Sequence, residues 1–151
     1  MKFIKLEENG HWCFPVAMDS FEFEGFIYVV YDTILNRAYL GKKKFITRKN
    51  GCNDREGWKS YSTSSSVVNG LKERSKTGGF LFICLDQYRF SGALAYAETW
   101  SLCHVDAPMS DTWYNKRIEG ISWKVKEPVT ERHKQRLDIV QQLLDGKLKL
   151  T

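Results

Sequence analysis

Two tyrosines stand at positions from which their side chains could act on one small group. Tyr28 lies in a β-branched and aromatic run, residues 25–31, and Tyr39 follows a segment rich in turn residues. If the chain closes as a hairpin around Thr33 and Ile34, residues whose numbers sum to 67 face each other, and 28 plus 39 is 67. Directly opposed residues have Cβ atoms about 5 Å apart, so two phenol hydroxyls could converge on one phosphate or water. Ordinary strand tyrosines remain the alternative, since aromatic residues are enriched in strands.

A carboxylate interrupts an otherwise apolar helical stripe further along the chain. Leu94, Glu98, Leu102 and Val105 fall on one face of a helix, and only the glutamate is charged. Burying a carboxylate among leucines is unfavourable unless it is paired, protonated or bound to a cation. Magnesium is commonly held by one or two carboxylates together with water and phosphate. The stripe therefore predicts either a metal ligand or a salt bridge to a lysine across the domain.

Positive charge is concentrated directly after the second tyrosine. The segment from residue 37 to 49 has no acidic residue and six basic ones: Arg37, Lys42, Lys43, Lys44, Arg48 and Lys49. Such a segment suits a phosphate backbone, and the formal net charge of +5 also favours a polyanionic partner. A solvated surface is the alternative for a basic run of this length.

The elements that would position these residues can be placed from periodicity and turn signals. Strands are expected at 25–31, from 38 onward, at 80–85 and at 121–125, and a loop at 50–57. One helix should follow the serines at 62 and 64–66, a second should run from a Ser91 cap through Val105, and a third should start at Thr130 and end before Gly146. The pattern predicts a compact α/β domain of the α+β kind, whose sheet need not be parallel.

Length and composition exclude several other classes of protein. A chain of 151 residues is the size of one domain, and it contains no apolar run of the ~20 residues that a membrane helix requires. The N-terminus lacks the apolar stretch of a signal peptide, so we expect a cytoplasmic protein. The four cysteines form no CxxC pair, which favours reduced thiols over a zinc site or disulfides.

The same residues resemble the GIY-YIG nuclease family. Residues 26–28, Phe-Ile-Tyr, stand where the family has GIY, and residues 39–41, Tyr-Leu-Gly, stand where it has YIG. The sequence is most similar to small phage-borne, homing-type (Seg-like) members, in which lysines, a phenylalanine and a basic insertion follow YIG. The further matches, in order, are Lys42-Lys43-Lys44-Phe45, Trp58-Lys59-Ser60-Tyr61, Ser64-Ser65, Ala97-Glu98 and Trp113-Tyr114-Asn115.

The resemblance implies a fold, a reaction and a set of site residues. The fold would be a small antiparallel three-stranded sheet flanked by helices, with residues 1–20 as an N-terminal extension, 21–118 as the nuclease domain, and 119–151 as a strand and helix packed on the same domain. The reaction would be hydrolysis of DNA phosphodiester bonds with Mg²⁺ or Mn²⁺ on Glu98, in the cytoplasm of a host cell if a phage encodes the chain. Catalytic roles fall to Tyr28, Tyr39, Lys43, Arg74, Glu98 and Asn115, and DNA contacts to Lys42, Lys44, Arg48, Lys49, Ser64 and Ser65.

Two features of the chain depart from the family pattern. Phe26 and Leu40 replace the glycine and isoleucine of the name motifs. The catalytic arginine of the family has no unambiguous counterpart, and Arg48, Arg55, Arg74 and Lys43 compete for its role, with Arg74 and Lys43 ahead. A nucleic-acid-binding module that has lost cleavage is therefore the alternative, and an interaction protein that exposes its five tryptophans is a third possibility.

Overall fold

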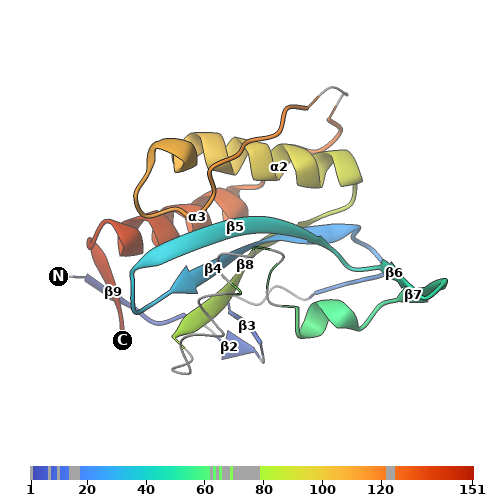
Figure 1. The fold of residues 1–151 in the computed structure, drawn as a ribbon, viewed down its shortest axis with the longest axis horizontal. Helices are drawn as coiled ribbons and strands as arrows, with labels where there is room; N and C mark the ends of the chain where they lie inside the picture. The colour runs from blue at the N-terminus through green and yellow to red at the C-terminus, as the bar shows by residue number, and fades with distance from the viewer. Residues whose placement is uncertain are drawn as a thin grey trace.

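A computed structural model describes residues 2–6, 8–9, 11–13, 18–61, 63, 65, 69, 79–121 and 125–151 of the chain. The longest elements are the strands β4 (Gly25–Asp32), β5 (Arg37–Lys44) and β8 (Phe80–Tyr88) and the helices α2 (Ser91–His104) and α3 (Glu131–Leu144). Short elements connect or flank them: β1 (Lys2–Ile4), β2 (Glu8–Asn9), β3 (Trp12–Cys13), β6 (Thr47–Lys49), β7 (Cys52–Asp54), η1 (Gly57–Lys59), η2 (Ala107–Met109) and β9 (Leu148–Leu150). Figure 1 shows α2 and α3 on the same side of the long strands.

The main sheet has five strands in the order β2-β3-β8-β4-β5. The central strand β4 is antiparallel to both of its neighbours, β5 and β8, as expected, but β3 pairs with β8 in parallel, so the sheet is mixed. The prediction of three antiparallel strands was therefore wrong for the whole sheet. Trp12 and Cys13 join it from the segment taken as an N-terminal extension, and a strand of two residues is too short to show a period of its own.

The β4–β5 hairpin closes two positions away from the predicted register. Its partners sum to 69, so Tyr28 faces Gly41 and Tyr39 faces Val30, and the two tyrosines are not directly opposed. The reason is a four-residue turn. The Asp32 carboxylate accepts hydrogen bonds from the backbone N–H groups of residues 34 and 35, both at 3.0 Å, and residue 36, an asparagine, takes a left-handed φ of 53°. A shift of two residues keeps both tyrosines on the same face of the sheet as diagonal neighbours.

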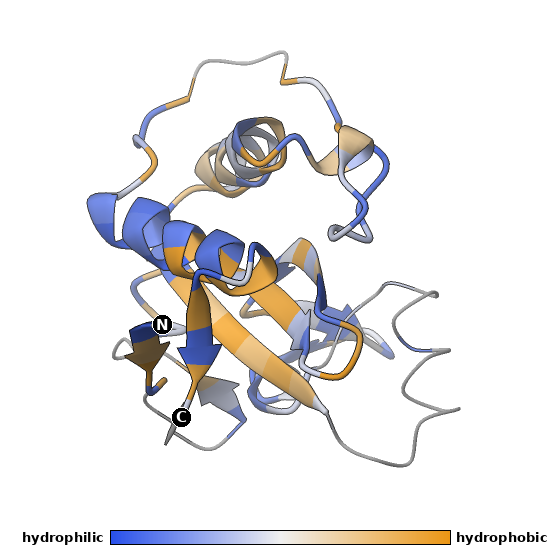
Figure 2. Cartoon of the chain, turned by 90° about the vertical axis from the view of Figure 1, so that its left-hand side faces the viewer, coloured by the Kyte–Doolittle hydropathy of each residue, from blue (hydrophilic) through white to orange (hydrophobic). Residues whose placement is uncertain are grey.

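The two faces of the sheet are covered differently. Alternate residues such as Ile27, Val29 and Leu40 pack against apolar residues of α2 and α3, and Figure 2 shows the hydrophilic side of α3 turned away from the sheet. The opposite face carries a cluster rich in aromatic side chains: Trp12, Phe26, Tyr28, Val30, Phe45, Trp58 and Cys84, with Tyr39 and Tyr61 at its margin. The strand alternation thus separates an aliphatic core from an aromatic one.

Helix boundaries follow the sequence closely, with one wrong cap. Thr130 caps α3 as predicted, because its hydroxyl accepts from the backbone N–H of His133 at 3.1 Å. Ser91 was expected to cap α2 but is its first helical residue. Phe90 is the N-cap, and the Ser91 hydroxyl instead donates to the Glu24 carboxylate at 3.3 Å.

The apolar stripe of α3 packs on the core, whereas the basic residues near its start form ion pairs or hydrogen bonds with other residues of the chain. Leu137, Val140 and Leu144 are buried. Arg132 lies 3.8 Å from Asp86, Lys134 lies 3.5 Å from Glu131, and Arg136 donates to the backbone carbonyl of Cys84 at 3.0 Å. The Arg136 contact falls at an irregularity in the β4–β8 pairing, where Leu85 is an extra residue.

Several further expectations concern the remaining segments. Apart from residue 69, the helix predicted after residue 66 falls outside the described residues, as does most of the strand predicted at 121–125. The predicted loop at 50–57 contains strand β7 and the start of η1, and the N- and C-terminal strands β1 and β9 pair in parallel. None of the four cysteines forms a disulfide. Among the described residues, no helix is long and apolar enough to cross a membrane.

Candidate active site

Strand β5 lies at the edge of the sheet, and the backbone groups on its outer side form hydrogen bonds with three different kinds of partner. At Ala38 the cover is backbone: its N–H donates to the carbonyl of Thr112 at 2.9 Å, and its carbonyl accepts from Tyr114 N–H at 2.7 Å. At Leu40 it is a side chain, because the Asn115 amide donates to the carbonyl and accepts from the N–H, both at 2.8 Å. At Lys42 the backbone N–H is hydrogen-bonded to the Glu98 carboxylate. The outward-facing backbone groups of β5 are therefore hydrogen-bonded at every second residue from Ala38 to Lys42, where the partner is Glu98.

Glu98 is half-buried on α2, between the buried residues Leu94 and Leu102 of the predicted stripe. Burial raises the pKa of its carboxyl above the ordinary value, and the charge of Glu119 raises it further. The charge and backbone N–H of Lys42 oppose this shift. No ion pair to Glu98 within 4.0 Å occurs among the described residues. The salt bridge that was the alternative to a metal ligand is therefore not formed with a described residue, and the carboxylate contacts the backbone N–H of Lys42 instead.

A cavity of about 440 Å³ brings Glu98 together with two other predicted site residues, Tyr39 and Asn115. The rest of its lining is Leu102, Tyr114, Lys116, Arg117 and Glu119. The Asn115 side-chain amide uses one N–H and one oxygen lone pair in its two hydrogen bonds with the backbone of Leu40. It therefore orders the edge of β5 and keeps one further N–H for a ligand.

The donor set of this cavity fits a hard cation shared with a substrate. Two carboxylates, Glu98 and Glu119, face a space large enough for a phosphate group, and oxygen ligands of this kind suit Mg²⁺ or Mn²⁺. No group of three His, Cys, Asp or Glu residues that could hold a metal occurs in the described part of the chain. Any ion would consequently depend on phosphate and water oxygens for most of its coordination.

Tyr28 does not line this cavity. Its side chain is 0% exposed, and its hydroxyl lies 3.5 Å from the Thr63 hydroxyl. The ring sits over Gly41, where a Cβ atom would fall 2.5 Å from the Tyr28 oxygen, so the glycine of the second motif makes room for the tyrosine of the first. Burial raises the pKa of Tyr28 strongly above its ordinary value, and only the hydrogen bond with Thr63 opposes this shift. The ring still contacts Tyr39, with centroids 6.4 Å apart.

The predicted basic and hydroxyl residues are spread over several surfaces. Lys43 stacks on the Tyr61 ring at 4.6 Å, and burial lowers its pKa while Asp54 opposes the shift. Lys44 lies 3.5 Å from Glu24, and Lys42 and Arg48 are exposed. Ser65 is half-buried, and its N–H donates to the Thr63 hydroxyl at 3.1 Å.

Three of the predicted residues cannot be located as side chains. Ser64 and Arg74 lie outside the described residues, and of Lys49 only the backbone, in β6, is described.

Three cavity residues were missed by the sequence analysis: Lys116, Arg117 and Glu119. Tyr114 was named only as part of the Trp113-Tyr114-Asn115 match. Among the described arginines, Arg117 is the one that lines the cavity, whereas Arg48 and Arg55, which were considered for the family arginine, do not. Its position two residues after Asn115 was an available signal, because a strand-like segment would place alternate side chains on one side.

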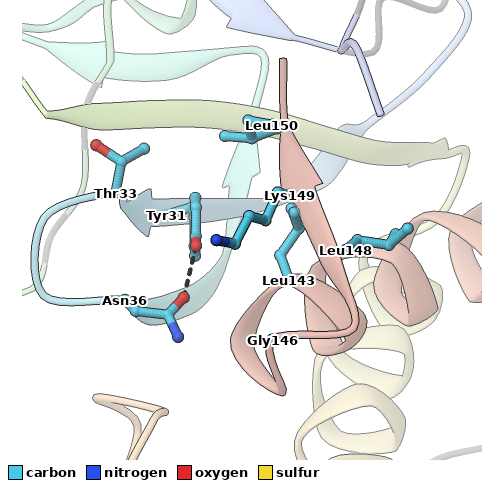
Figure 3. A pocket seen from close by; sticks show the side chains of 8 residues that line it. All are labelled: Tyr31, Thr33, Asn36, Leu143, Gly146, Leu148, Lys149 and Leu150. Carbon is cyan, nitrogen blue, oxygen red and sulfur yellow. Dashed lines mark hydrogen bonds between the residues drawn. The ribbon is translucent and has the colours of Figure 1, made fainter. Parts of the chain in front are cut away.

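A second cavity, of about 330 Å³, lies at the far end of the hairpin and contains none of the predicted site residues. Figure 3 shows Lys149 pointing toward Tyr31, whose hydroxyl donates to Asn36 at 2.5 Å. The remaining lining residues are Thr33, Leu143, Gly146, Leu148 and Leu150. With one cation and no carboxylate, this cavity offers no metal site.

The α+β sheet with a carboxylate, a tyrosine and an asparagine at its edge is the arrangement that the resemblance to GIY-YIG nucleases implies. The family model described as "Putative endonuclease segE, GIY-YIG domain" matches residues 13–118, which is more than half of the chain. The chain belongs to this SegE-type GIY-YIG endonuclease family, and the resemblance seen in the sequence is confirmed. No curated protein and no solved structure matches the chain.

Proposed function

We propose that the chain is a metal-dependent endonuclease that hydrolyses DNA phosphodiester bonds at the cavity beside β5. The single observation that carries the proposal is the convergence of Glu98, Tyr39 and Asn115 on one cavity in a chain of this family. The three residues come from separate segments of the chain and meet at strand β5, where Asn115 is hydrogen-bonded to Leu40 and Glu98 to the backbone of Lys42.

The residues of the cavity would divide the work as follows. Glu98, with Glu119 beside it, would hold Mg²⁺ or Mn²⁺, which when bound polarises the phosphodiester and stabilises the leaving oxygen. The Tyr39 hydroxyl orients the attacking water, and the remaining amide N–H of Asn115 binds a phosphate oxygen. Arg117 contributes the positive charge that stabilises the transition state, the role considered above for Arg74 and Lys43.

Tyr28 acts in this proposal through Tyr39 and not as a base. A phenol whose pKa is raised by burial stays protonated at neutral pH, so it cannot accept a proton from water at a useful rate. Its ring supports the Tyr39 ring, and its fit over Gly41 holds β4 and β5 in register. Tyr28 is therefore a positioning residue.

Incubation of supercoiled plasmid with the protein in Mg²⁺, and separately in EDTA, tests the proposal. Nicked or linear product only in Mg²⁺ supports it, and absence of product in Mg²⁺ or Mn²⁺ contradicts it. Glu98→Gln should abolish cleavage and retain DNA binding. Glu56→Gln, at an exposed carboxylate that pairs with Lys59, is the matched control and should cut normally.

A catalytically inactive nucleic-acid-binding module with the same fold is the second candidate. The observation that favours it is the complete burial of Tyr28, one of the two tyrosines from which the family takes its motifs. Binding of DNA without cleavage in any divalent cation would select this alternative.

A further inference from the structure

One face of β5 presents a row of a cation, a tyrosine and a second cation. Ala38 and Leu40 turn toward the helices and are fully buried, so Arg37, Tyr39 and Lys43 lie on the other face, where each is half-buried. Tyr39, in the middle of the row, lines the candidate active-site cavity. The two cations therefore lie on either side of the place where a scissile phosphate would be held.

Arg37 is held in place by an aromatic ring. Its guanidinium carbon lies 4.3 Å from the centroid of the Tyr114 ring. That ring is itself fixed, because its hydroxyl donates to the Asp32 carboxylate at 3.2 Å and its backbone is paired with Ala38. Tyr114 also lines the cavity, so the stacked arginine stands at the cavity wall.

Apart from its position over the Tyr114 ring, the Arg37 guanidinium has no ion pair within 4.0 Å among the described residues. It makes no hydrogen bond with the described part of the chain, and its Nε atom is buried without a partner there. Because Nε is covered, an anion would meet the terminal amino groups, which carry four of the five N–H donors of the side chain. A half-buried cation without a partner is unfavourable until an anion binds, and a guanidinium matches phosphate oxygens in geometry.

Two other arginines show that a guanidinium stacked on a ring can also form an ion pair or a hydrogen bond. Arg89 lies 4.8 Å from the centroid of the Phe23 ring, but it pairs with the Glu22 carboxylate. Arg55 lies 4.8 Å from the centroid of the Phe21 ring, and it donates to the carbonyl of Ser20 at 3.4 Å. Arg37 differs from both because its stacked guanidinium retains its hydrogen-bonding capacity.

The row is long enough to contact more than one phosphate of a DNA strand. From Arg37 to Lys43 is six residues, or roughly 20 Å at about 3.4 Å per residue in a strand. This length exceeds the separation of neighbouring phosphates, so the two cations at its ends can contact different phosphates. We propose that Arg37, stacked on Tyr114, and Lys43, stacked on Tyr61, bind two backbone phosphates of one DNA strand that runs along β5, on either side of the phosphate held at Tyr39. This inference rests on the proposed function, since both require DNA at the same cavity.

The salt dependence of DNA binding tests the proposed contacts without relying on catalysis. Binding of a labelled 20-base-pair duplex is measured in EDTA over a series of salt concentrations for wild type, Arg37→Gln, Lys43→Gln and the double variant. Glutamine keeps part of the stem against each ring and removes the charge. Each single variant should reduce the slope of log affinity against log salt by about 0.9, and the double variant by about 1.8. Arg89→Gln, which removes a stacked but ion-paired arginine, should leave the slope unchanged.

The outcomes separate this inference from the proposed function. A wild type that cuts plasmid in Mg²⁺, combined with an unchanged slope in Arg37→Gln, would overturn the Arg37 contact while leaving the nuclease proposal intact. A wild type that neither binds nor cuts would overturn both. Thermal unfolding of each variant accompanies the binding data, and Arg37→Lys, which keeps the charge, should restore the wild-type slope even if the stack is weakened.

Discussion

The stability of the fold should fall as the pH is lowered from 7 to 5, because a buried histidine joins three elements in its neutral form. His133 on α3 is 0% exposed. Ser101 Oγ lies 2.6 Å from the carbonyl of Ala97, to which it donates, and 2.6 Å from His133 Nε2, so Nε2 is the donor in that second contact. On the other side of the ring, Tyr88 Oη lies 3.0 Å from Nδ1. The Tyr88 oxygen accepts from the Thr130 N–H at 3.2 Å, which leaves its own proton for Nδ1. A second proton on the ring has no acceptor in this chain of hydrogen bonds.

The magnitude follows from the pKa of this histidine. Burial, with a smaller contribution from Lys134, lowers the pKa from 6.5 to about 4 in the folded state. Because the folded pKa is depressed, the stabilisation is complete above pH 6.5 and is lost as the pH falls toward 4. A shift of about 2.5 pKa units corresponds to roughly 3.4 kcal/mol in full, and to about 1.8 kcal/mol between pH 7 and pH 5.

Urea unfolding at pH 7 and pH 5 measures this loss, with His133→Gln as the informative variant. Glutamine can donate and accept hydrogen bonds without titrating, so the variant should lose about 1.8 kcal/mol less than wild type over this interval. The exposed His104, which lies 3.6 Å from Asp138, provides the control: His104→Gln should keep the wild-type pH dependence. Equal pH dependence in wild type and His133→Gln would refute the reasoning, since the buried ring would then not be the group that titrates.

Four further outcomes are expected at and around the cavity. Glu98→Gln should leave no detectable plasmid cleavage and an unchanged DNA affinity in EDTA, because the amide keeps the volume and loses the metal ligand. Tyr39→Phe should lower single-turnover cleavage by about 10² or more, and Tyr28→Phe should lower it less, because a positioning ring remains after its hydroxyl is removed. Arg117→Ala should reduce kcat at unchanged thermal stability, whereas equal rates would return the charge-stabilising role to the other basic residues. Gly41→Ala should lower the free energy of unfolding by about 1–3 kcal/mol, measured in urea, because the added Cβ falls on a ring that is fully enclosed.

Much of the fold could be predicted because its signals are local. The run of β-branched residues in β4, the apolar stripe of α3 and the Thr130 cap each depend on a few neighbouring residues, and each was placed correctly. The hairpin register was wrong because it depended on the number of residues in the turn. The Asp32 carboxylate fixed that number by binding two backbone N–H groups, a side-chain effect that strand propensity does not contain.

Three residues that line the cavity, Tyr39, Glu98 and Asn115, were named from the sequence, whereas the burial of Tyr28 and the hydrogen bonding of the predicted residues were not foreseen. The spacing of Leu94, Glu98 and Leu102 correctly placed a carboxylate among apolar neighbours. Whether Tyr28 is exposed or enclosed depends on Thr63, Tyr61 and other residues distant in sequence, and no pattern around Tyr28 itself reports them. Arg117 was missed because its place in the cavity wall depends on residues that are distant in the sequence, such as Tyr39 and Glu98.

The position of β5 at the edge of the sheet reconciles access with stability in this site. An edge strand leaves a row of unpaired backbone groups, which proteins normally cover to avoid pairing with other chains. Here the cover changes from backbone at Ala38 to an amide at Leu40 and then to a carboxylate at Lys42, so the edge is satisfied without a further strand beyond it. A sixth strand would have closed the approach to the cavity between Glu98 and Tyr39.

Asn115→Ala should therefore affect stability as well as activity, because it removes both hydrogen bonds to Leu40. Unsatisfied backbone groups are expected to cost about 1–3 kcal/mol, and this loss should appear in urea unfolding even when no DNA is present. An Asn115→Ala variant with wild-type stability and impaired cleavage would instead mean that this amide serves the substrate alone.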